Sequence, residues 1–272
     1  MSTFAGYLYS RVTSAVDFLN GTYQQKLNHA QLLCDLKKAI RLQNLNLVLE
    51  IIHKGLDLYK DFLIFPPDLD TIFLDHPLLQ ACREKFRTNE DQLAIIRCLV
   101  EKAHADVNVR DGNGNTALIY ACQGNYKETV QYLISRGADV NVRDEYGSTA
   151  LTYACTRNYK ETVQYLISRG ADVNIRDEQG GTALMGACII GHASVVETLL
   201  EAGANPNIRS NQGKTALMYV SEKLMYVSEK STEADNYKEI VEWLEWYNLD
   251  FPDGLDRGQE LEEKSCSPFN KC

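Results

Sequence analysis

Several signatures of enzymes and membrane proteins are missing from this sequence of 272 residues. It contains no glycine-rich phosphate loop, no H-E-x-x-H helix and no G-x-S-x-G nucleophile turn, the motifs of common nucleotide, zinc and serine enzymes. No stretch approaches the roughly 20 apolar residues that a membrane-spanning helix needs, and the basic-then-apolar pattern of a secretory signal is absent. We therefore expect a non-catalytic, cytoplasmic protein without a membrane span.

Positive charge is also scarce. The 28 Lys and Arg residues are outnumbered by 37 Asp and Glu residues, which gives a formal net charge of -9. A grip on phosphate backbones requires clustered basic residues, so nucleic acid is not an expected partner. There is no C-x-x-C pair among the eight cysteines, which argues against a structural zinc site, and nothing in the sequence calls for a cofactor.

What the sequence does contain is an internal repeat with a period of 33 residues. Residues 125–144 and 158–177 are identical at 19 of 20 positions. A period of this size indicates a stack of small units, each of which buries its apolar face against its neighbours. The three clear units cover residues 111–143, 144–176 and 177–209.

Each unit shows the same local signals. A Gly-containing turn is followed by T-A-L-x-x-A-C, a short first helix whose start is marked by a potential N-cap threonine. The first helix ends before a residue that tolerates left-handed backbone, and a second helix follows with an apolar face such as Val130, Leu133 and Ile134. The N-cap residues are Thr116, Thr149 and Thr182, and the left-handed positions are Asn125, Asn158 and Gly191.

The motif D-x-x-G-x-T-x-L, the closing G-A-D-V-N and the 33-residue period together resemble the ankyrin repeat. The resemblance implies an all-α solenoid of about six helix-turn-helix repeats with β-turn fingers. We expect an N-terminal helical extension over residues 1–28, an array over 29–249 and an acidic, disordered tail over 250–272. The expected repeats are 29–60, 76–110, 111–143, 144–176, 177–209 and 210–249. Cys82, Cys122, Cys155 and Cys188 share one repeat position and should be reduced core residues.

Partners of ankyrin proteins contact the turn tips and the concave inner face of the first helices. In this chain, residues 112–124 and 145–157 agree at only seven of 13 positions, although the segments that follow them are nearly identical. This divergence favours a surface that selects a partner, with neutral drift as the alternative, and Tyr146 and Arg157 are the expected anchors. The candidate positions are Asn113, Asn115, Gln123, Tyr146, Ser148, Thr156, Arg157, Gln179, Ile189 and Ile190.

Three further features are open to two interpretations each. Arg110, Arg143, Arg176 and Arg209 recur every 33 residues and would either support the turns or bind an acidic partner. The heptad LMYVSEK at 217–223 is repeated directly at 224–230. The second copy would either be accommodated as a loop or an extended helix, or form an apolar surface of Leu224, Met225 and Val227 for a partner. By resemblance to substrates of asparaginyl hydroxylases, Asn141 and Asn174 are candidate modification sites.

We therefore interpret the chain as a monomeric adaptor that binds a protein partner. Its glutamate-rich C-terminal stretch, residues 259–264 and the tail after it, resembles the translocation signal of bacterial type IV effectors, which implies secretion into a host cell cytosol. The main alternative is a cytosolic inhibitor that masks its partner, similar to the ankyrin inhibitors with acidic tails. A remote alternative is a thiol-dependent enzyme built on Cys34.

Overall fold

The computed structural model of the chain describes residues 31–56, 76–228 and 231–250. The expected extension over 1–28 lies outside these residues, as does the expected tail apart from Asp250. Within the described ranges all regular elements are helices, accompanied by one isolated antiparallel bridge between Arg110 and Thr116. The predicted all-α fold is thus confirmed. The chain falls into two compact units that meet at the bond between Asp106 and Val107.

The first unit contains helical residues 31–41, α2 (Leu45–His53), α5 (Pro77–Arg83) and α6 (Asn89–Glu101). Both α2 and α5 pack against α6. Helix α2 begins where the Asn44 side chain accepts a hydrogen bond from the Leu47 N–H, and α6 where Thr88 accepts one from the Asp91 N–H. These caps satisfy N–H groups that a helix cannot bond internally.

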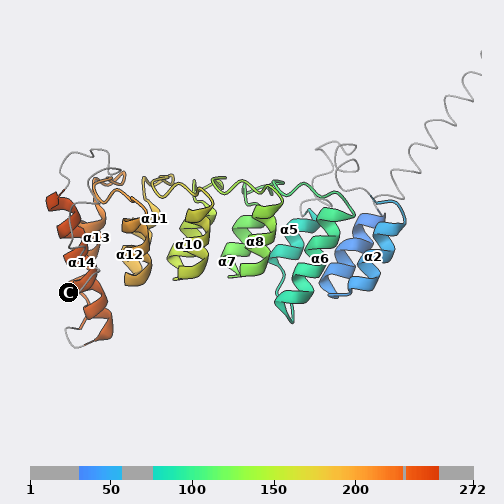
Figure 1. Cartoon of the computed structure of the whole chain (residues 1–272), viewed down its shortest axis with the longest axis horizontal. Helices are drawn as coiled ribbons and strands as arrows, with labels where there is room; N and C mark the ends of the chain where they lie inside the picture. The colour runs from blue at the N-terminus through green and yellow to red at the C-terminus, as the bar shows by residue number, and fades with distance from the viewer. Residues whose placement is uncertain (1–30, 57–75, 229–230, 251–272) are drawn as a thin grey trace, which may run out of the picture. The chain divides into compact units, whose positions relative to one another are not determined.

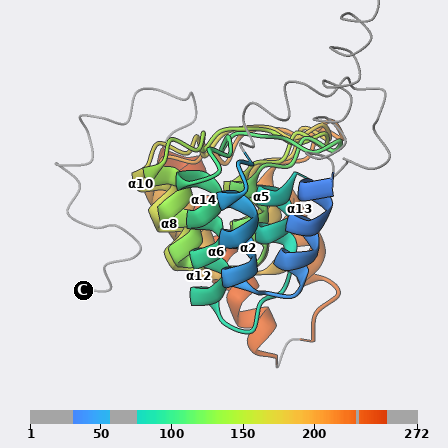
Figure 2. The ribbon, with the colours of Figure 1, turned by 90° about the vertical axis from the view of Figure 1, so that its right-hand side faces the viewer.

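The described part of the second unit, residues 107–228 and 231–250, contains four pairs of helices. The pairs are α7 (Ala117–Gln123) with α8 (Lys127–Ser135), α9 (Ala150–Thr156) with α10 (Lys160–Ser168), α11 (Ala183–Ile190) with α12 (Ala193–Glu201), and α13 (Ala216–Leu224) with α14 (Thr232–Asp250). The first helices stack in the order α7, α9, α11, α13, and α12 packs between α10 and α14. The turns that join successive pairs lie along one edge of this unit (Figure 1) and across one end of its helices in the perpendicular view (Figure 2).

The predicted helix boundaries follow from local chemistry in the third, fourth and fifth repeats. The side chains of Thr116, Thr149 and Thr182 accept hydrogen bonds from backbone N–H groups three residues later, at 3.3, 3.4 and 3.3 Å. Asn125 and Asn158 have φ angles of 56° and 60°, so the first helix ends in left-handed backbone as expected. Gly191 takes the same conformation, with φ of 82°.

The apolar core is centred on the first helices. Cys82, Cys122, Cys155 and Cys188 are buried free thiols, as predicted, and burial raises the pKa of each of them. On α8 the predicted apolar face needs a correction, because Ile134 is only half-buried whereas Thr129 is buried beside Val130 and Leu133. Residue 133 lies four positions after 129 and three after 130, so these residues form the buried stripe and residue 134 lies at its border.

The duplicated heptad does not continue the helix for two turns. Its first copy lies in α13, which has nine residues compared with seven in α7 and α9. The second copy leaves the helix at Met225, and residues 225–227 form a turn in which Met225 and Tyr226 are 76% and 88% exposed. Leu224 and Val227, the other two residues of the apolar surface proposed from the sequence, are half-buried. Because the described part of the second copy is mostly outside the helix, it is accommodated mainly as a loop.

Candidate partner-binding surface

Each turn between repeats is here called a finger, and in the third, fourth and fifth repeats it is closed by the aspartate that opens the repeat. In the third repeat, Asp111 Oδ1 accepts hydrogen bonds from the backbone N–H groups of Asn113 and Asn115, both at 2.9 Å. Asp144 and Asp177 make the equivalent pairs of bonds in the next two fingers. The aspartates close the turns through backbone groups, and in the third finger the Asn115 side chain also donates to both carboxylate oxygens of Asp111, at 3.4 Å.

Neighbouring fingers are joined by single backbone hydrogen bonds. The N–H of Glu145 donates to Asn113 O at 2.8 Å, that of Glu178 to Tyr146 O at 2.9 Å, and that of Asn211 to Gln179 O at 2.9 Å. The tips therefore sit at a fixed spacing along the second unit.

The recurring arginines stabilise the fingers by donating hydrogen bonds to backbone carbonyl oxygens. Arg143 Nε donates to Gly147 O in its own finger at 3.2 Å, and its Nη2 donates to Arg176 O in the next at 2.9 Å. Arg110 and Arg176 repeat both bonds. Gly147 has φ of 77°, and a Cβ there would approach Arg143 Nη2 to 2.6 Å, which explains the glycine. These bonds support the turn-support interpretation of the arginines over an acidic partner.

Three tyrosines that the sequence did not single out connect the fingers to the first helices. Tyr120 donates its hydroxyl to Asp111 Oδ2 at 2.5 Å, and Tyr153 donates to Asp144 Oδ2 at 2.6 Å. Tyr219 donates to Ser210 Oγ at 3.0 Å. In each case the tyrosine lies nine residues after the finger residue, and that offset is the signal in the sequence that could have revealed the pairing.

The candidate residues fall into two groups. Asn113, Asn115, Tyr146, Ser148 and Gln179 lie in the fingers, and Gln123, Thr156, Arg157, Ile189 and Ile190 lie at the C-terminal ends of α7, α9 and α11. Tyr146 is 63% exposed and Ile190 43%. Ile189 is only half-buried rather than fully exposed, because consecutive helical residues point about 100° apart.

Tyr153 links the two groups in the fourth repeat. Burial and the hydrogen bond to Asp144 raise the pKa of Tyr153, whereas a hydrogen bond with Gln123 and the positive charge of Arg157 act in the opposite direction. Gln123 at the end of α7 and Arg157 just after α9 therefore both act on the Tyr153 phenol, one through a hydrogen bond and the other through its charge, while Tyr146 stands at the tip of the same finger. No described contact joins the fifth-repeat candidates to this cluster.

The candidate modification sites are already engaged in bonds between repeats. Asn141 Nδ2 donates to Gly170 O at 3.0 Å, and its Oδ1 accepts from the Asp172 N–H at 2.9 Å. Asn174 makes the equivalent pair with Gly203 and Asn205. A modifying enzyme would have to reach these side chains while they are hydrogen-bonded to the next repeat, or break those bonds. Their hydroxylation stays a prediction.

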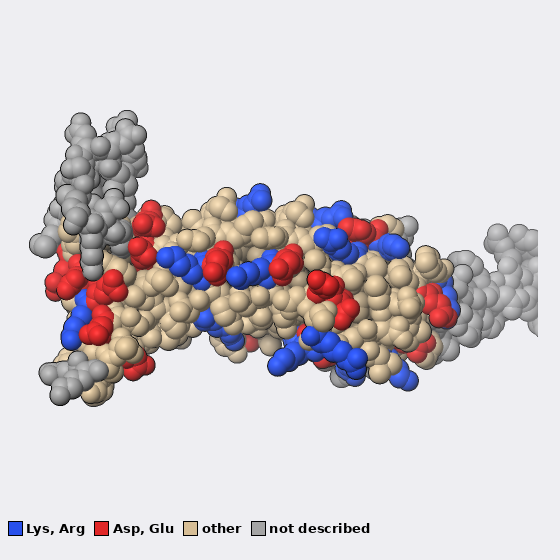
Figure 3. Space-filling model, turned by 60° about the horizontal axis from the view of Figure 1, so that its bottom comes forward, with Lys and Arg blue, Asp and Glu red and all other residues tan. Residues whose placement is uncertain are grey.

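Charges on the exposed surface are mixed in sign. In Figure 3, Lys and Arg side chains alternate with Asp and Glu side chains across the visible face instead of gathering into one basic area. Two ion pairs join successive second helices, Lys127 with Glu161 at 3.3 Å and Lys160 with Glu197 at 3.2 Å. These pairs are partly exposed, so screening by solvent keeps their contribution to stability small.

The described residues offer little else for chemistry. They hold no group of three or more His, Cys, Asp or Glu side chains placed to bind a metal ion. Among them, no helix combines the length and the apolar character that crossing a bilayer would demand. Cys34, the residue of the remote enzymatic alternative, is an exposed free thiol in helical residues 31–41.

Comparison with known proteins identifies the repeats. The model for ankyrin repeats (3 copies) matches residues 78–177, and the model for ankyrin repeats (many copies) matches residues 166–220. Together these matches span residues 78–220, just over half of the chain. An ankyrin repeat protein of Acanthamoeba polyphaga mimivirus is 37% identical over 62 residues, which is 23% of this chain and 8% of that protein. The matched segment is thus only a small part of the relative's length.

Proposed function

This chain belongs to the ankyrin repeat family and is a protein–protein interaction module; we propose that it is a non-catalytic adaptor whose partner binds the finger tips and the exposed face of the first helices. The observation that carries the proposal is that the positions shared by the repeats and the positions that vary between them have different surroundings. The residues that repeat are bound within the fold, whereas the varying positions at the finger tip and just after the first helix, such as Tyr146 and Arg157, are exposed.

The comparison of the third and fourth repeats supports this difference. The seven positions they share between residues 112–124 and 145–157 include the glycine with positive φ, the capping threonine, the tyrosine and the buried leucine and cysteine. The positions that differ include exposed Tyr146 and Arg157. Neutral drift would also spare the buried residues, but it gives no reason for a large aromatic side chain, 63% exposed, at a finger tip.

A pull-down with a matched control tests the proposal. We expect Tyr146→Ala combined with Arg157→Ala to weaken capture of the partner tenfold or more, since aromatic and arginine anchors contribute about 2 kcal/mol or more at interfaces. Gln131→Ala combined with Gln164→Ala alters exposed residues on α8 and α10 and should leave capture unchanged. If the double variant of the finger and α9 retains full binding, this surface is not the interface.

We further propose that the adaptor is a monomer in the cytoplasm, and that it is an effector delivered into a host cell. The support is the resemblance of residues 259–264 and the following tail to a translocation signal. Deleting residues 258–272 separates the two roles considered. Lost delivery with retained partner binding would favour the effector, whereas lost binding would favour an inhibitor that uses its acidic tail. Sedimentation of the purified chain tests the monomer.

A thiol-dependent activity stays a remote alternative. Ankyrin repeat proteins are generally interaction scaffolds. Turnover that disappears in Cys34→Ser would nevertheless replace the adaptor proposal with an enzyme.

A further inference from the structure

The pairing of finger and tyrosine is broken in the fifth repeat. In the third, fourth and sixth repeats a tyrosine hydroxyl reaches back to the residue that opens the finger. In the fifth repeat the position nine residues after Asp177 is Gly186, which has no side chain. Asp177 Oδ1 still accepts from the N–H groups of Gln179 and Gly181, but Oδ2 has no hydrogen-bond partner among the described residues.

Glycines replace the two side chains that would otherwise lie near this oxygen. A Cβ added at Gly186 would meet only the methyl group of Thr156 within 4 Å, at 3.0 Å. Gly181 stands where Asn115 and Ser148 stand in the preceding repeats, and a Cβ there would lie 2.8 Å from Asp177 Oδ2. Both side chains that accompany the carboxylate in a neighbouring repeat are therefore missing here.

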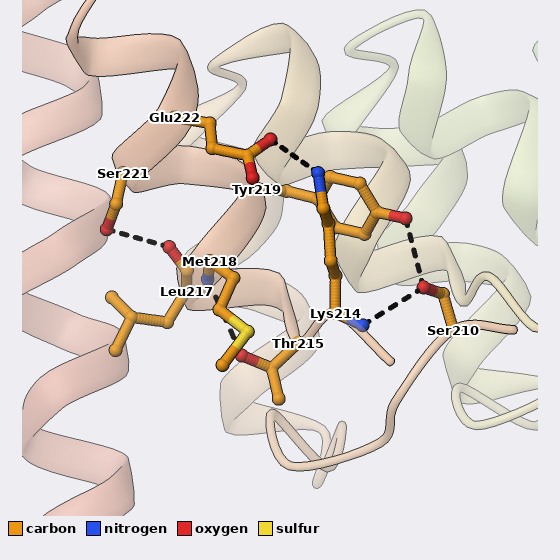
Figure 4. Close-up of polar contacts among 8 residues, drawn as sticks. All are labelled: Ser210, Lys214, Thr215, Leu217, Met218, Tyr219, Ser221 and Glu222. Atoms are coloured by element: carbon orange, nitrogen blue, oxygen red, sulfur yellow. Dashed lines mark hydrogen bonds and ion pairs between the residues drawn. The ribbon is translucent and has the colours of Figure 1, made fainter. Parts of the chain in front are cut away.

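The basic residues of the adjoining fingers are used elsewhere. Arg176 donates to the carbonyl oxygens of Gly180 and Arg209. Lys214 bonds Glu222 at 2.7 Å and lies over the ring of Tyr219, as Figure 4 shows for this cluster. No ion pair within the described ranges neutralises Asp177.

We propose that a protein partner places an arginine side chain in the position of the missing tyrosine, where its guanidinium donates to Asp177 Oδ2 and its methylene groups cover Gly186. The inference rests on the proposed function and names the chemistry of its partner. A guanidinium offers several donors in one plane, and its positive charge adds an attraction to the carboxylate that a tyrosine hydroxyl lacks. The net charge of -9 adds a general attraction for basic partners.

The probe is N-acetyl-arginine amide, titrated into the full chain while backbone amide signals are followed by NMR. We expect concentration-dependent shifts at Asp177, Gly181 and Gly186 but not at Asp144, Ser148 and Tyr153, the equivalent positions of the fourth repeat. The acetylated amides of tyrosine and glutamate serve as comparisons and should shift these signals less.

Two variants test the site. Asp177→Asn retains an Oδ1 acceptor for the turn but replaces Oδ2 with a donor, and it should weaken the arginine probe about tenfold or more. Asp144→Asn, whose counterpart oxygen is already occupied by Tyr153, should leave the probe's affinity unchanged. Gly186→Tyr should occupy the position and also abolish the shifts.

The inference is overturned if no probe shifts these amides, if the tyrosine amide binds better than the arginine amide, or if Asp177→Asn and Asp144→Asn behave alike. Such results leave the adaptor proposal standing as long as Tyr146→Ala with Arg157→Ala weakens partner capture. Failure of the pull-down with retained arginine shifts would instead point to an interface centred on the fifth repeat.

Discussion

Arg143, which is hydrogen-bonded to two successive fingers, provides a direct test of how much such bonds stabilise the array. Arg143 makes two hydrogen bonds to backbone carbonyls, to Gly147 O at 3.2 Å and to Arg176 O at 2.9 Å. Hydrogen bonds to charged groups contribute about 1.5–3 kcal/mol each, but the side chain is exposed, so water replaces part of each bond. We expect Arg143→Ala to lower the free energy of unfolding by about 2 kcal/mol.

Arg209 provides the matched control, because it keeps the bond within its own finger, to Gly213 O at 2.8 Å, and has no described bond to a following finger. Arg209→Ala should therefore cost about half as much, roughly 1 kcal/mol. Urea unfolding followed by far-UV circular dichroism measures both, with a nearest-neighbour model because repeat arrays need not unfold in one step. Equal losses for the two variants, or a negligible loss for Arg143→Ala, would refute the idea that the second bond couples neighbouring repeats.

Three further predictions concern the same unit and the exposed thiol. Tyr153→Phe should cost about 1 kcal/mol at neutral pH. Because the folded pKa of Tyr153 is raised, this stabilisation is fully present below the unfolded pKa of about 10 and is lost as the pH rises through the folded pKa, so the wild type and variant should converge in alkaline urea titrations. Native-state alkylation with iodoacetamide, read by mass spectrometry, should modify exposed Cys34 well before buried Cys155. Asn141→Ala should lower the free energy of unfolding by about 1–2 kcal/mol in the same urea assay, because two bonds to the next repeat are lost.

The features that could be predicted from the sequence are those set by short stretches of chain. Thr149 caps a helix through the N–H three residues later, and Asn158 ends one by adopting left-handed backbone, so neither depends on distant residues. Cys155 was recognisable as core because it recurs at one position on a helix that is apolar in every repeat. Repetition made these local signals strong, since each was present several times.

The remaining features depend on how one repeat lies on the next. No local sequence signal shows that Arg143 donates to a carbonyl oxygen 33 residues away. Its role depends on how neighbouring fingers lie next to each other in the folded array. Tyr153 looked like part of the invariant framework, and its bond to Asp144 emerges only when the helix folds back under its own finger. The loop after α13 has a similar cause. Helix α11, against which α13 packs on one side, has eight residues, so a two-turn extension would run past the end of that neighbour.

The sixth finger shows that turn closure does not require a carboxylate at the position of Asp177. Ser210 occupies the equivalent position there, and its Oγ accepts from the Lys214 N–H at 3.3 Å and from the Tyr219 hydroxyl at 3.0 Å. A finger can therefore close on one neutral oxygen, which means that the second oxygen and the negative charge of Asp177 are not required by the turn. In the third and fourth repeats that extra oxygen is used to hold a tyrosine, and in the fifth it is left uncovered beside a glycine. The fold thus retains an acceptor that no group of the described chain occupies and that is left to solvent, and this is the physical basis for placing a donor from the partner at that position.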